Sequence, residues 1–273
     1  MIAALRRAPQ LALGIALCGC AVVAALVSLV WTPHDPAAID LARALAPPSW
    51  THPLGTDPLG RDVLSMVLAG ARASLGVALG AVLIGVGIGA PLGLLAGVRG
   101  GVVDGVVMRL NDVAFAFPAL LLAILLTSVI GQNALNAAIA IGVFNIPVFA
   151  RLVRGDARAL MQRDFVLAAR AGGMSRLAIA RRHILPNLAD QVLIQGATQV
   201  SVAVLAEAAL SYVGIGVQPP TPSWGRMLSE TQTFSFLAPH LAIAPGLAIF
   251  ATVLGLSLLA DGLREARDPR RAA

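Results

Sequence analysis

The sequence predicts an all-α membrane protein with six transmembrane helices, on the strength of its composition and its long uncharged stretches. Of its 273 residues, 58% are hydrophobic and only 12% are charged, and the mean hydropathy is +0.82. Soluble domains carry about 25% charged residues, so lipid must cover much of this surface. Several stretches also reach the roughly 20 apolar residues that a helix needs to cross a hydrocarbon core.

The six predicted helices come from five long stretches in which charged residues are absent or nearly so. These stretches are 11–31, 73–98, 113–150, 191–217 and 231–260. The third is too long for one helix, and Gly131 and Asn133 lie in its middle, so it predicts two helices joined by a turn. The last helix is expected to begin near His240.

The distribution of arginines predicts the orientation of the helices. All 20 basic residues are arginines, and 16 of them lie in the N-terminal end, in 99–109, in 151–190 and in the C-terminal tail. With six spans these four pieces share one side, and positively charged loops face the cytoplasm. Both termini are therefore predicted to be cytoplasmic. The first apolar stretch is longer than the 7–15 residues of a signal peptide, so we expect it to remain as an anchor.

Residue types exclude several functions. The chain contains no lysine, which a P-loop requires, so it is not a P-loop ATPase by itself. The net charge of +6 is explained by membrane topology rather than by nucleic-acid binding. Cys18 and Cys20 are one residue apart in an apolar stretch and build neither a disulfide nor a four-ligand metal site. His34, His52 and His240 lie outside the spans or at their edges, and no metal site is predicted.

Small residues and prolines mark the predicted spans. Glycines recur at every fourth position of the second span, at Gly85, Gly89, Gly93 and Gly97. Such a stripe lets two helix backbones approach closely, either within this chain or against a second membrane subunit. Prolines fall inside four spans, at Pro91, Pro118, Pro147 and Pro245. Each removes a backbone donor and favours a kink, and kinked helices line pathways or act as hinges.

Glu207 is the only acidic residue well inside a predicted span. An ionisable group there is costly and is a candidate functional residue. Asp112 and Asp261 lie near helix ends, so no second charge within the spans pairs with it. A proton relay needs a chain of titratable groups, which the spans lack. We therefore favour a structural role for Glu207, hydrogen-bonded to a neighbour, over a role in transport coupling.

The segment 151–190 predicts a helix-turn-helix on the cytoplasmic surface. Apolar or small residues recur there at helical spacing, at Phe165, Ala168, Ala169 and Gly172. Gly172 and Gly173 would end the first helix, and Ser175 would cap a second. The two helices would present an apolar ridge to a partner outside the membrane. The alternative is an arginine-rich loop that only fixes topology, which would not need this helix-glycine-helix pattern.

The same segment resembles the cytoplasmic EAA loop of permease subunits of ATP-binding cassette (ABC) importers. The resemblance lies in 165–173, with its Ala168, Ala169 and Gly173, and in 183–187 with Pro186. Further stretches are similar to the dipeptide, oligopeptide and nickel permeases of the C-subunit type, namely 52–57, 59–64, 117–118, 150–155, 206–225 and 261–269. Together they cover roughly residues 50–270.

The resemblance implies a type I ABC importer permease with an EAA-type coupling loop between its fourth and fifth helices. The implied coupling residues are Asp164, Leu167, Ala168, Ala169, Gly173, His183, Leu185 and Pro186. Gly173 would allow the turn and Pro186 would set the return into the fifth span. Two positions depart from the family. Leu167 stands where a glutamate is usual, which removes a charge, and Gly172 replaces a bulky aliphatic residue, which loosens the turn.

The resemblance also implies the organisation of the chain and its partners. Residues 1–31 would form a cytoplasmic end and the first helix, 32–72 an extracytoplasmic segment, 73–261 the permease core and 262–273 a cytoplasmic tail. The partners would be a second permease subunit, two cytoplasmic ATP-binding subunits, an extracytoplasmic solute-binding protein and the lipid bilayer of a bacterial inner membrane.

On this interpretation the chain has no catalytic site and binds no cofactor or metal, and ATP and magnesium are used by the partner subunits. The solute would be a dipeptide or oligopeptide, or alternatively a nickel complex or a glutathione-type molecule. A stand-alone secondary transporter is the rival class, and an intramembrane hydrolase is disfavoured because no Ser/His or paired-Asp arrangement falls within the spans.

Overall fold

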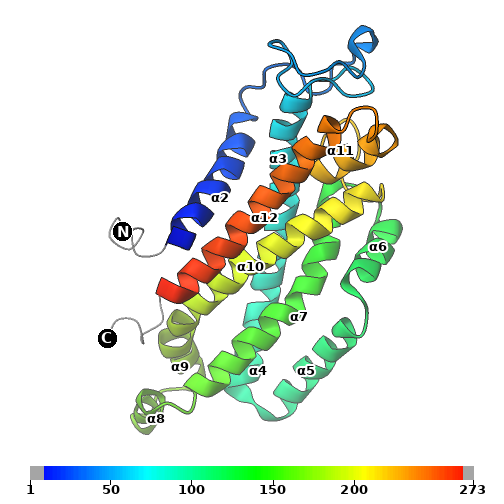
Figure 1. Ribbon diagram of the computed structural model, residues 1–273. Helices are drawn as coiled ribbons and strands as arrows, with labels where there is room; N and C mark the ends of the chain where they lie inside the picture. The colour runs from blue at the N-terminus through cyan, green and yellow to red at the C-terminus, as the bar shows by residue number, and fades with distance from the viewer. Residues whose placement is uncertain (1–8, 267–273) are drawn as a thin grey trace.

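The computed structural model describes residues 9–266, which form a bundle of helices with short connecting segments (Figure 1). In chain order the helices are α2 (Pro9–Val27), η1 (Leu41–Arg43), α3 (Val63–Ile84), η2 (Gly85–Gly89), α4 (Ala90–Arg99), α5 (Gly101–Phe115), α6 (Ala119–Ile130), α7 (Ala134–Leu160), α8 (Asp164–Ala171), α9 (Arg176–Ile179), η3 (Ala180–Ile184), α10 (Leu185–Tyr212), α11 (Trp224–Thr231), η4 (Gln232–Phe234) and α12 (His240–Ala266). The helices η2 and η3 are π-helical turns, and η1 and η4 are 3₁₀ turns.

The predicted fold class is confirmed. Among the described residues, five segments are long and apolar enough to cross a membrane: α2, the continuous helix 63–99, α7, the continuous helix 176–212 and α12. The helices α5 and α6 together supply a sixth span if they are counted as one bent pair. The predicted turn between the third and fourth spans is present, because Gly131 ends α6 and the Asn133 side chain caps α7.

The third span differs from its prediction. It was expected to begin at Val113 after a loop over 99–109, but α5 already begins at Gly101 after a sharp turn at Gly100, where φ is +66°. The chain then bends by 86° between α5 and α6. The break falls at Phe117-Pro118 because a proline disfavours helical backbone in the residue before it. The kink that Pro118 favours is therefore present, as a break between α5 and α6.

The glycine stripe of the second span packs against another helix of this chain. Of the two alternatives for this helical face, packing within the chain is therefore the one that the structure has, rather than packing against a second membrane subunit. A side-chain carbon at Gly85 would lie 2.5 Å from the Asn145 side chain, and one at Gly89 would overlap the Ile146 carbonyl. A side chain at Gly93 would overlap the carbonyl of Ala150. The helices α4 and α7 therefore lie backbone against backbone, as small residues allow in a membrane.

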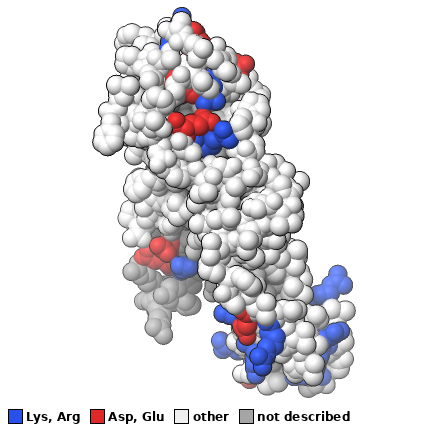
Figure 2. All heavy atoms as spheres, turned by 90° about the vertical axis from the view of Figure 1, so that its right-hand side faces the viewer, with Lys and Arg blue, Asp and Glu red and all other residues white. Residues whose placement is uncertain are grey.

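Charged side chains gather at the two ends of the molecule and leave an uncharged band between them (Figure 2). Most buried apolar residues form one core along this band, and a smaller second core packs α8 and α9 against the ends of α7 and α10. The uncharged band matches a protein whose middle lies in hydrocarbon. At the opposite end, the segment 32–62 and the segment 213–239 with α11 cover the bundle (Figure 1).

Candidate functional site

The predicted helix-turn-helix is present as α8 and α9, joined by the turn 172–175. We term residues 164–179 the α8–α9 hairpin. Val166 and Ile179 are fully buried and pack with Val153, Ile184 and Leu188 in the second core. These contacts anchor the hairpin to α7 and α10. The predicted ridge did not include Val166. The apolar side chain of Val166 points inward, although the residues on either side of it in the sequence are exposed.

The turn of the hairpin depends on Gly173. Its φ is +81°, a left-handed conformation that glycine adopts without strain. The Gly173 amide donates to the Arg170 carbonyl at 3.0 Å, and the Met174 amide donates to the Ala169 carbonyl at 3.0 Å. This pair of bonds is the Schellman arrangement that ends a helix with glycine. The Ser175 hydroxyl then accepts from the Ala178 amide, so the predicted cap of α9 is present.

The outer face of the hairpin leaves large apolar side chains uncovered. Phe165 is 43% exposed and Leu167 is 49% exposed, whereas Leu177, which is 69% exposed, lines a groove against α4. Ala168 and Gly172 are also exposed, while Ala169 is half-buried. The predicted ridge therefore exists in modified form, because Leu167 belongs to the exposed apolar surface and Ala169 turns partly toward the core. Asp164 lies in the first turn of α8, where a negative charge favours the helix dipole.

The three remaining coupling-loop residues lie where η3 passes into α10. The His183 ring lies 6.1 Å from the Phe165 ring, which brings the two predicted parts of the loop together. Leu185 is half exposed, and Pro186 lies in the first turn of α10. The role of Pro186 in setting the return into the fifth span stays a prediction, and the structure has a continuous helix there from Arg176 to Tyr212. The π-helical turn η3 directly precedes this proline, which has no amide hydrogen to donate.

Some arginines of the predicted loop make ion pairs that sequence reasoning missed. Arg154 donates two hydrogen bonds to Asp104, at 2.7 and 2.6 Å, and Arg158 lies 3.6 Å from the same carboxylate. Arg151 pairs with Asp112 at 3.0 Å. These pairs fasten α5 to α7. The alternative in which the arginines only fix topology does not account for these pairs. The signal was the acidic residues of 101–115, which were assigned to a loop and a helix end.

Glu207 lies far from the hairpin, at the other end of α10, and is completely buried. The Ser211 hydroxyl donates to its carboxylate at 2.6 Å, and the Val217 amide donates to the Ser211 hydroxyl at 3.0 Å. The Trp224 amide donates to the Ser74 hydroxyl at 3.2 Å. Glu207 thus belongs to a group of polar residues that joins α10 and α3 to the start of α11.

An apolar groove of about 280 Å³ lies between α6, α7 and α10, and its lining includes neither of the two candidate pathway prolines. Pro118 precedes α6, and Pro147 is buried inside α7. Phe144 and Asn145 of α7 line the groove, opposite Val202 and Ala206 of α10. The wall of the groove is almost entirely apolar, and Asn145 is the one polar side chain at its edge. The buried Asn145 amide donates to the Ile141 carbonyl at 3.3 Å.

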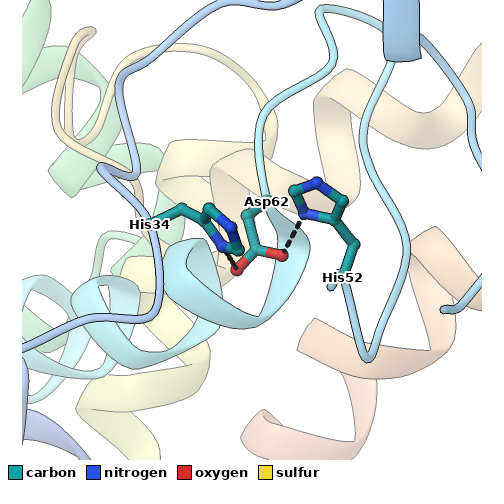
Figure 3. A group of neighbouring side chains, drawn as sticks. All are labelled: His34, His52 and Asp62. Atoms are coloured by element: carbon teal, nitrogen blue, oxygen red, sulfur yellow. Dashed lines mark hydrogen bonds and ion pairs between the residues drawn. The ribbon is translucent and has the colours of Figure 1, made fainter. Parts of the chain in front are cut away.

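The end of the molecule opposite the hairpin contains a buried polar cluster around Asp62 (Figure 3). His52 Nδ1 lies 2.9 Å from Asp62 Oδ1, and Arg43 donates to His52 Nε2 at 3.2 Å. Since arginine only donates, Nε2 accepts and Nδ1 carries the proton that His52 donates to Asp62. The other Asp62 oxygen accepts from the amide and hydroxyl of Ser65, at 2.8 and 2.6 Å, and so caps α3. His34 completes the cluster, 3.7 Å from Asp62.

This cluster caps the start of α3. Burial raises the pKa of the Asp62 carboxyl, but the hydrogen bonds from Ser65 and His52 outweigh burial and hold that pKa below its usual value. The cluster His34, His52 and Asp62 offers three possible metal-ligand atoms within 4.8 Å of one another. Hydrogen bonds within the described chain already engage both Asp62 oxygens and both His52 nitrogens, so we interpret the cluster as a helix cap. The sequence-based expectation of no metal site stays a prediction.

A second polar network lies beside the first. Arg61 donates to Asp57 at 2.6 Å and also to Glu230 of α11, and Arg226 donates to Glu230 at 2.7 Å. Burial lowers the pKa of Arg61, but the bonds and charges of Asp57 and Glu230 raise it above its usual value. The two networks join the segment 32–62 to α3 and α11, and sequence reasoning, which followed helices and motifs, did not foresee these contacts.

The fold and site define a class of protein: a multi-span membrane protein that carries a protruding helical hairpin at one end and a closed polar cap at the other. Its described helices superpose with a TM-score of 0.61 and 20% sequence identity on a chain of the methionine ABC transporter MetNI in inward-facing conformations. That alignment covers 74% of this chain and 97% of the other. The fold is therefore that of the membrane subunit of a type I ABC importer.

The chain belongs to the family of binding-protein-dependent transport system inner membrane components, which matches residues 89–273. A curated relative is the glutathione transport system permease protein GsiD of Shigella flexneri serotype 5b, 47% identical over 82% of this chain and 74% of its own length. GsiD of Escherichia coli O6:K15:H31 is 44% identical over the same shares. Membership makes this chain an inner-membrane permease component that works with ATP-binding and substrate-binding subunits.

Proposed function

We propose that this chain pairs with a second permease subunit and that its α8–α9 hairpin is the element moved by an ATP-binding subunit. The observation that carries the proposal is the contrast within the hairpin. Its inner side is fixed by Val166 and Ile179, while Phe165 and Leu167 remain exposed beside a glycine-dependent turn. Exposed apolar side chains on a rigid support are typical of a surface that a partner covers.

The anchoring of the hairpin supports a mechanism. The hairpin would sit in a groove of an ATP-binding subunit, and closure of the two ATP-binding subunits on ATP would displace it. Val166 packs in the same core as Val153 of α7 and Leu188 of α10, so a displacement would pass to both helices and alternate the access of the pathway. ATP and magnesium would be bound by those partners, and this chain would contribute no catalytic residue.

Topology and organisation belong to the same proposal. Both termini would be cytoplasmic, which puts the hairpin on the side of the ATP-binding subunits. Residues 73–261 would form the permease core, 1–31 a first helix with its cytoplasmic end, and 262–273 a cytoplasmic tail whose residues from 267 lie outside the described part. The segment 32–72 would face the extracytoplasmic solute-binding protein. The groove between α6, α7 and α10 would face the second permease and the pathway, with Glu207 holding the outer end of α10 in place.

The solute follows from the relatives, since GsiD is named a glutathione transport permease. We propose a peptide or glutathione-type substrate for this chain. Uptake by the complete transporter, reconstituted with its own binding protein, distinguishes the candidates when labelled glutathione, a dipeptide and a nickel complex are compared. Uptake of the nickel complex alone would contradict the peptide assignment.

The test of the coupling role is the change Gly173→Leu. We expect the variant to insert and fold but to lose the stimulation of ATP hydrolysis by substrate and binding protein, because φ of +81° is strained for leucine. The matched control is Gly155→Leu on α7, where a side chain meets nothing within 4 Å. Normal stimulation in folded Gly173→Leu would contradict the proposal. Uptake by the purified chain alone without ATP would instead establish a secondary transporter.

A further inference from the structure

A groove of about 320 Å³ lies between the end of α4 and α9, away from the groove assigned to the pathway. Its apolar wall includes Leu94, Leu95 and Val98 of α4 and Leu177 of α9. Two arginines, Arg99 and Arg176, lie at its polar end. The groove thus combines a long apolar wall with two positive charges.

The Arg176 side chain is held in place, and neither of the two arginines is neutralised. Arg176 donates to the backbone carbonyl of Arg99 at 3.1 Å, which fixes its guanidinium at the groove. Within residues 9–266, neither side chain forms an ion pair with a carboxylate, and no acidic residue lines the groove. Asp104, which lies a few residues after Arg99 in sequence, is already paired with Arg154 and Arg158. The groove therefore offers two guanidinium groups to an anion.

The position of Arg99 along its helix indicates at which level of the membrane the groove lies. Arg72 and Arg99 bracket the uncharged stretch 73–98 of one continuous helix. At 1.5 Å per residue this stretch rises about 40 Å, which matches the 40–45 Å of a bilayer with its headgroups. Arg99 therefore lies at headgroup depth when Arg72 lies at the opposite interface. Figure 1 shows α9 beside the end of α4, with α8 beyond it.

We propose that this groove binds an anionic phospholipid, whose phosphate is held by Arg99 and Arg176 and whose acyl chain runs along Leu94 and Leu95. Arginine pairs bind phosphate oxygens strongly through charge-assisted hydrogen bonds, and basic pockets between helices at the membrane surface take anionic headgroups. A free phosphate would satisfy the arginines but would make no contact with Leu95 and Leu177, which are 39% and 69% exposed. A phospholipid covers both parts of the groove.

A lipid in this position bridges the second span and the α8–α9 hairpin. Arg99 ends α4, and Arg176 begins α9, so one phosphate ties the two helices together. The binding site itself does not depend on which solute is transported or on how the hairpin meets a partner. An experiment that contradicts the lipid site therefore leaves the proposed coupling role of the hairpin untouched, and the reverse also holds.

The experiment is native mass spectrometry of the full chain, purified in mild detergent and offered phosphatidylglycerol or phosphatidylcholine with the same acyl chains. We expect the wild type to retain phosphatidylglycerol about ten-fold more than phosphatidylcholine. The double change Arg99→Gln with Arg176→Gln removes that preference. The double change of the same positions to lysine keeps most of it, because the positive charges remain and folding is undisturbed.

The matched control removes the same charge elsewhere on the same surface. Arg181 and Arg182 are exposed and do not line the groove, so changing both to glutamine leaves the preference intact. Equal losses in the two glutamine pairs would show general charge attraction and overturn the site. Absence of a preference in the wild type would overturn it as well. Displacement of the lipid by millimolar inorganic phosphate would assign the arginines to a free anion and contradict a phospholipid site.

Discussion

The two ends of this protein differ in whether their polar and apolar side chains are covered by other residues of the chain. At the end that contains α11, Asp62 is buried and Arg61 is half-buried, each with its partners, and Trp224 is only 2% exposed. At the hairpin end, Phe165 and Leu167 are partly exposed on a support that is itself well packed. The first end satisfies its groups internally, whereas the second leaves a surface that this chain does not cover.

The difference teaches where to expect stability and where to expect function. Changes in the closed end remove contacts that exist within the chain, so they lower the free energy of unfolding. Changes on the outer face of the hairpin remove few internal contacts, so they leave folding nearly unchanged and act on the interaction with a partner. Pairs of substitutions at the two ends test this contrast.

The largest contrast is expected from two glycines. A side chain at Gly225 would overlap the backbone of Ala208, whereas one at Gly172 would meet its nearest atoms at 3.6 Å. Gly225→Leu is expected to lower the free energy of unfolding by about 3 kcal/mol or more, and Gly172→Leu by less than about 0.5 kcal/mol. Denaturation of both variants in detergent measures the difference. Equal destabilisation would remove the distinction between the ends.

A smaller effect is expected at Asp62. Asp62→Ala removes the cap of α3 and leaves His52 without its acceptor, so we expect a loss of about 2 kcal/mol. Asp40 caps the exposed turn η1, and Asp40→Ala is the matched control, with an expected loss below about 1 kcal/mol. If the two losses are alike, burial of the Asp62 cluster adds no stability.

The same residue gives a pH dependence of known sign. The pKa of Asp62 is lowered in the folded state, so its stabilisation is complete above the usual aspartate value of about 3.9 and is lost as the pH falls through the lower folded value. Between pH 5 and pH 3 the wild type should lose more stability than Asp62→Ala. Parallel curves for the two proteins would contradict the hydrogen-bonded carboxylate.

The smallest change in stability, and a change in function, is expected at Leu167. Leu167→Glu restores the acid usual in the EAA motif at a half-exposed position, so stability should change by less than about 0.5 kcal/mol. Stimulation of ATP hydrolysis in the complete transporter should rise, because the added charge faces the partner. Leu167→Gln, which is polar but uncharged, is the control. A fall in stimulation specific to glutamate would mean that the apolar leucine is what the partner needs.

The sequence predicted the features of this fold that depend on local pattern. The uncharged stretches located the spans, and the sequence Gly172-Gly173 followed by Ser175 located the turn and the cap of α9. These predictions succeeded because helix ends have short-range chemistry. The glycine stripe was also recognised, but its partner helix α7 lies far along the chain, so its contact required the structure.

The remaining features arise from contacts between distant segments. The pairing of Arg154 with Asp104 and of Arg61 with Glu230 joins residues that no local pattern connects. Pro118 predicted a kink, but the 86° size of the bend between α5 and α6 required the structure. The groove beside Arg99 and Arg176 likewise forms only when α9 folds back against α4.

The most direct measurement for the central claim is photo-crosslinking from single positions in the assembled transporter. A photoreactive amino acid at position 167 of the hairpin is compared with one at position 41, which is 68% exposed at the closed end. We predict a cross-link to an ATP-binding subunit from position 167 and none from position 41. An active complex that gives no such cross-link from position 167 would contradict the assignment of the hairpin as the surface that the ATP-binding subunit covers.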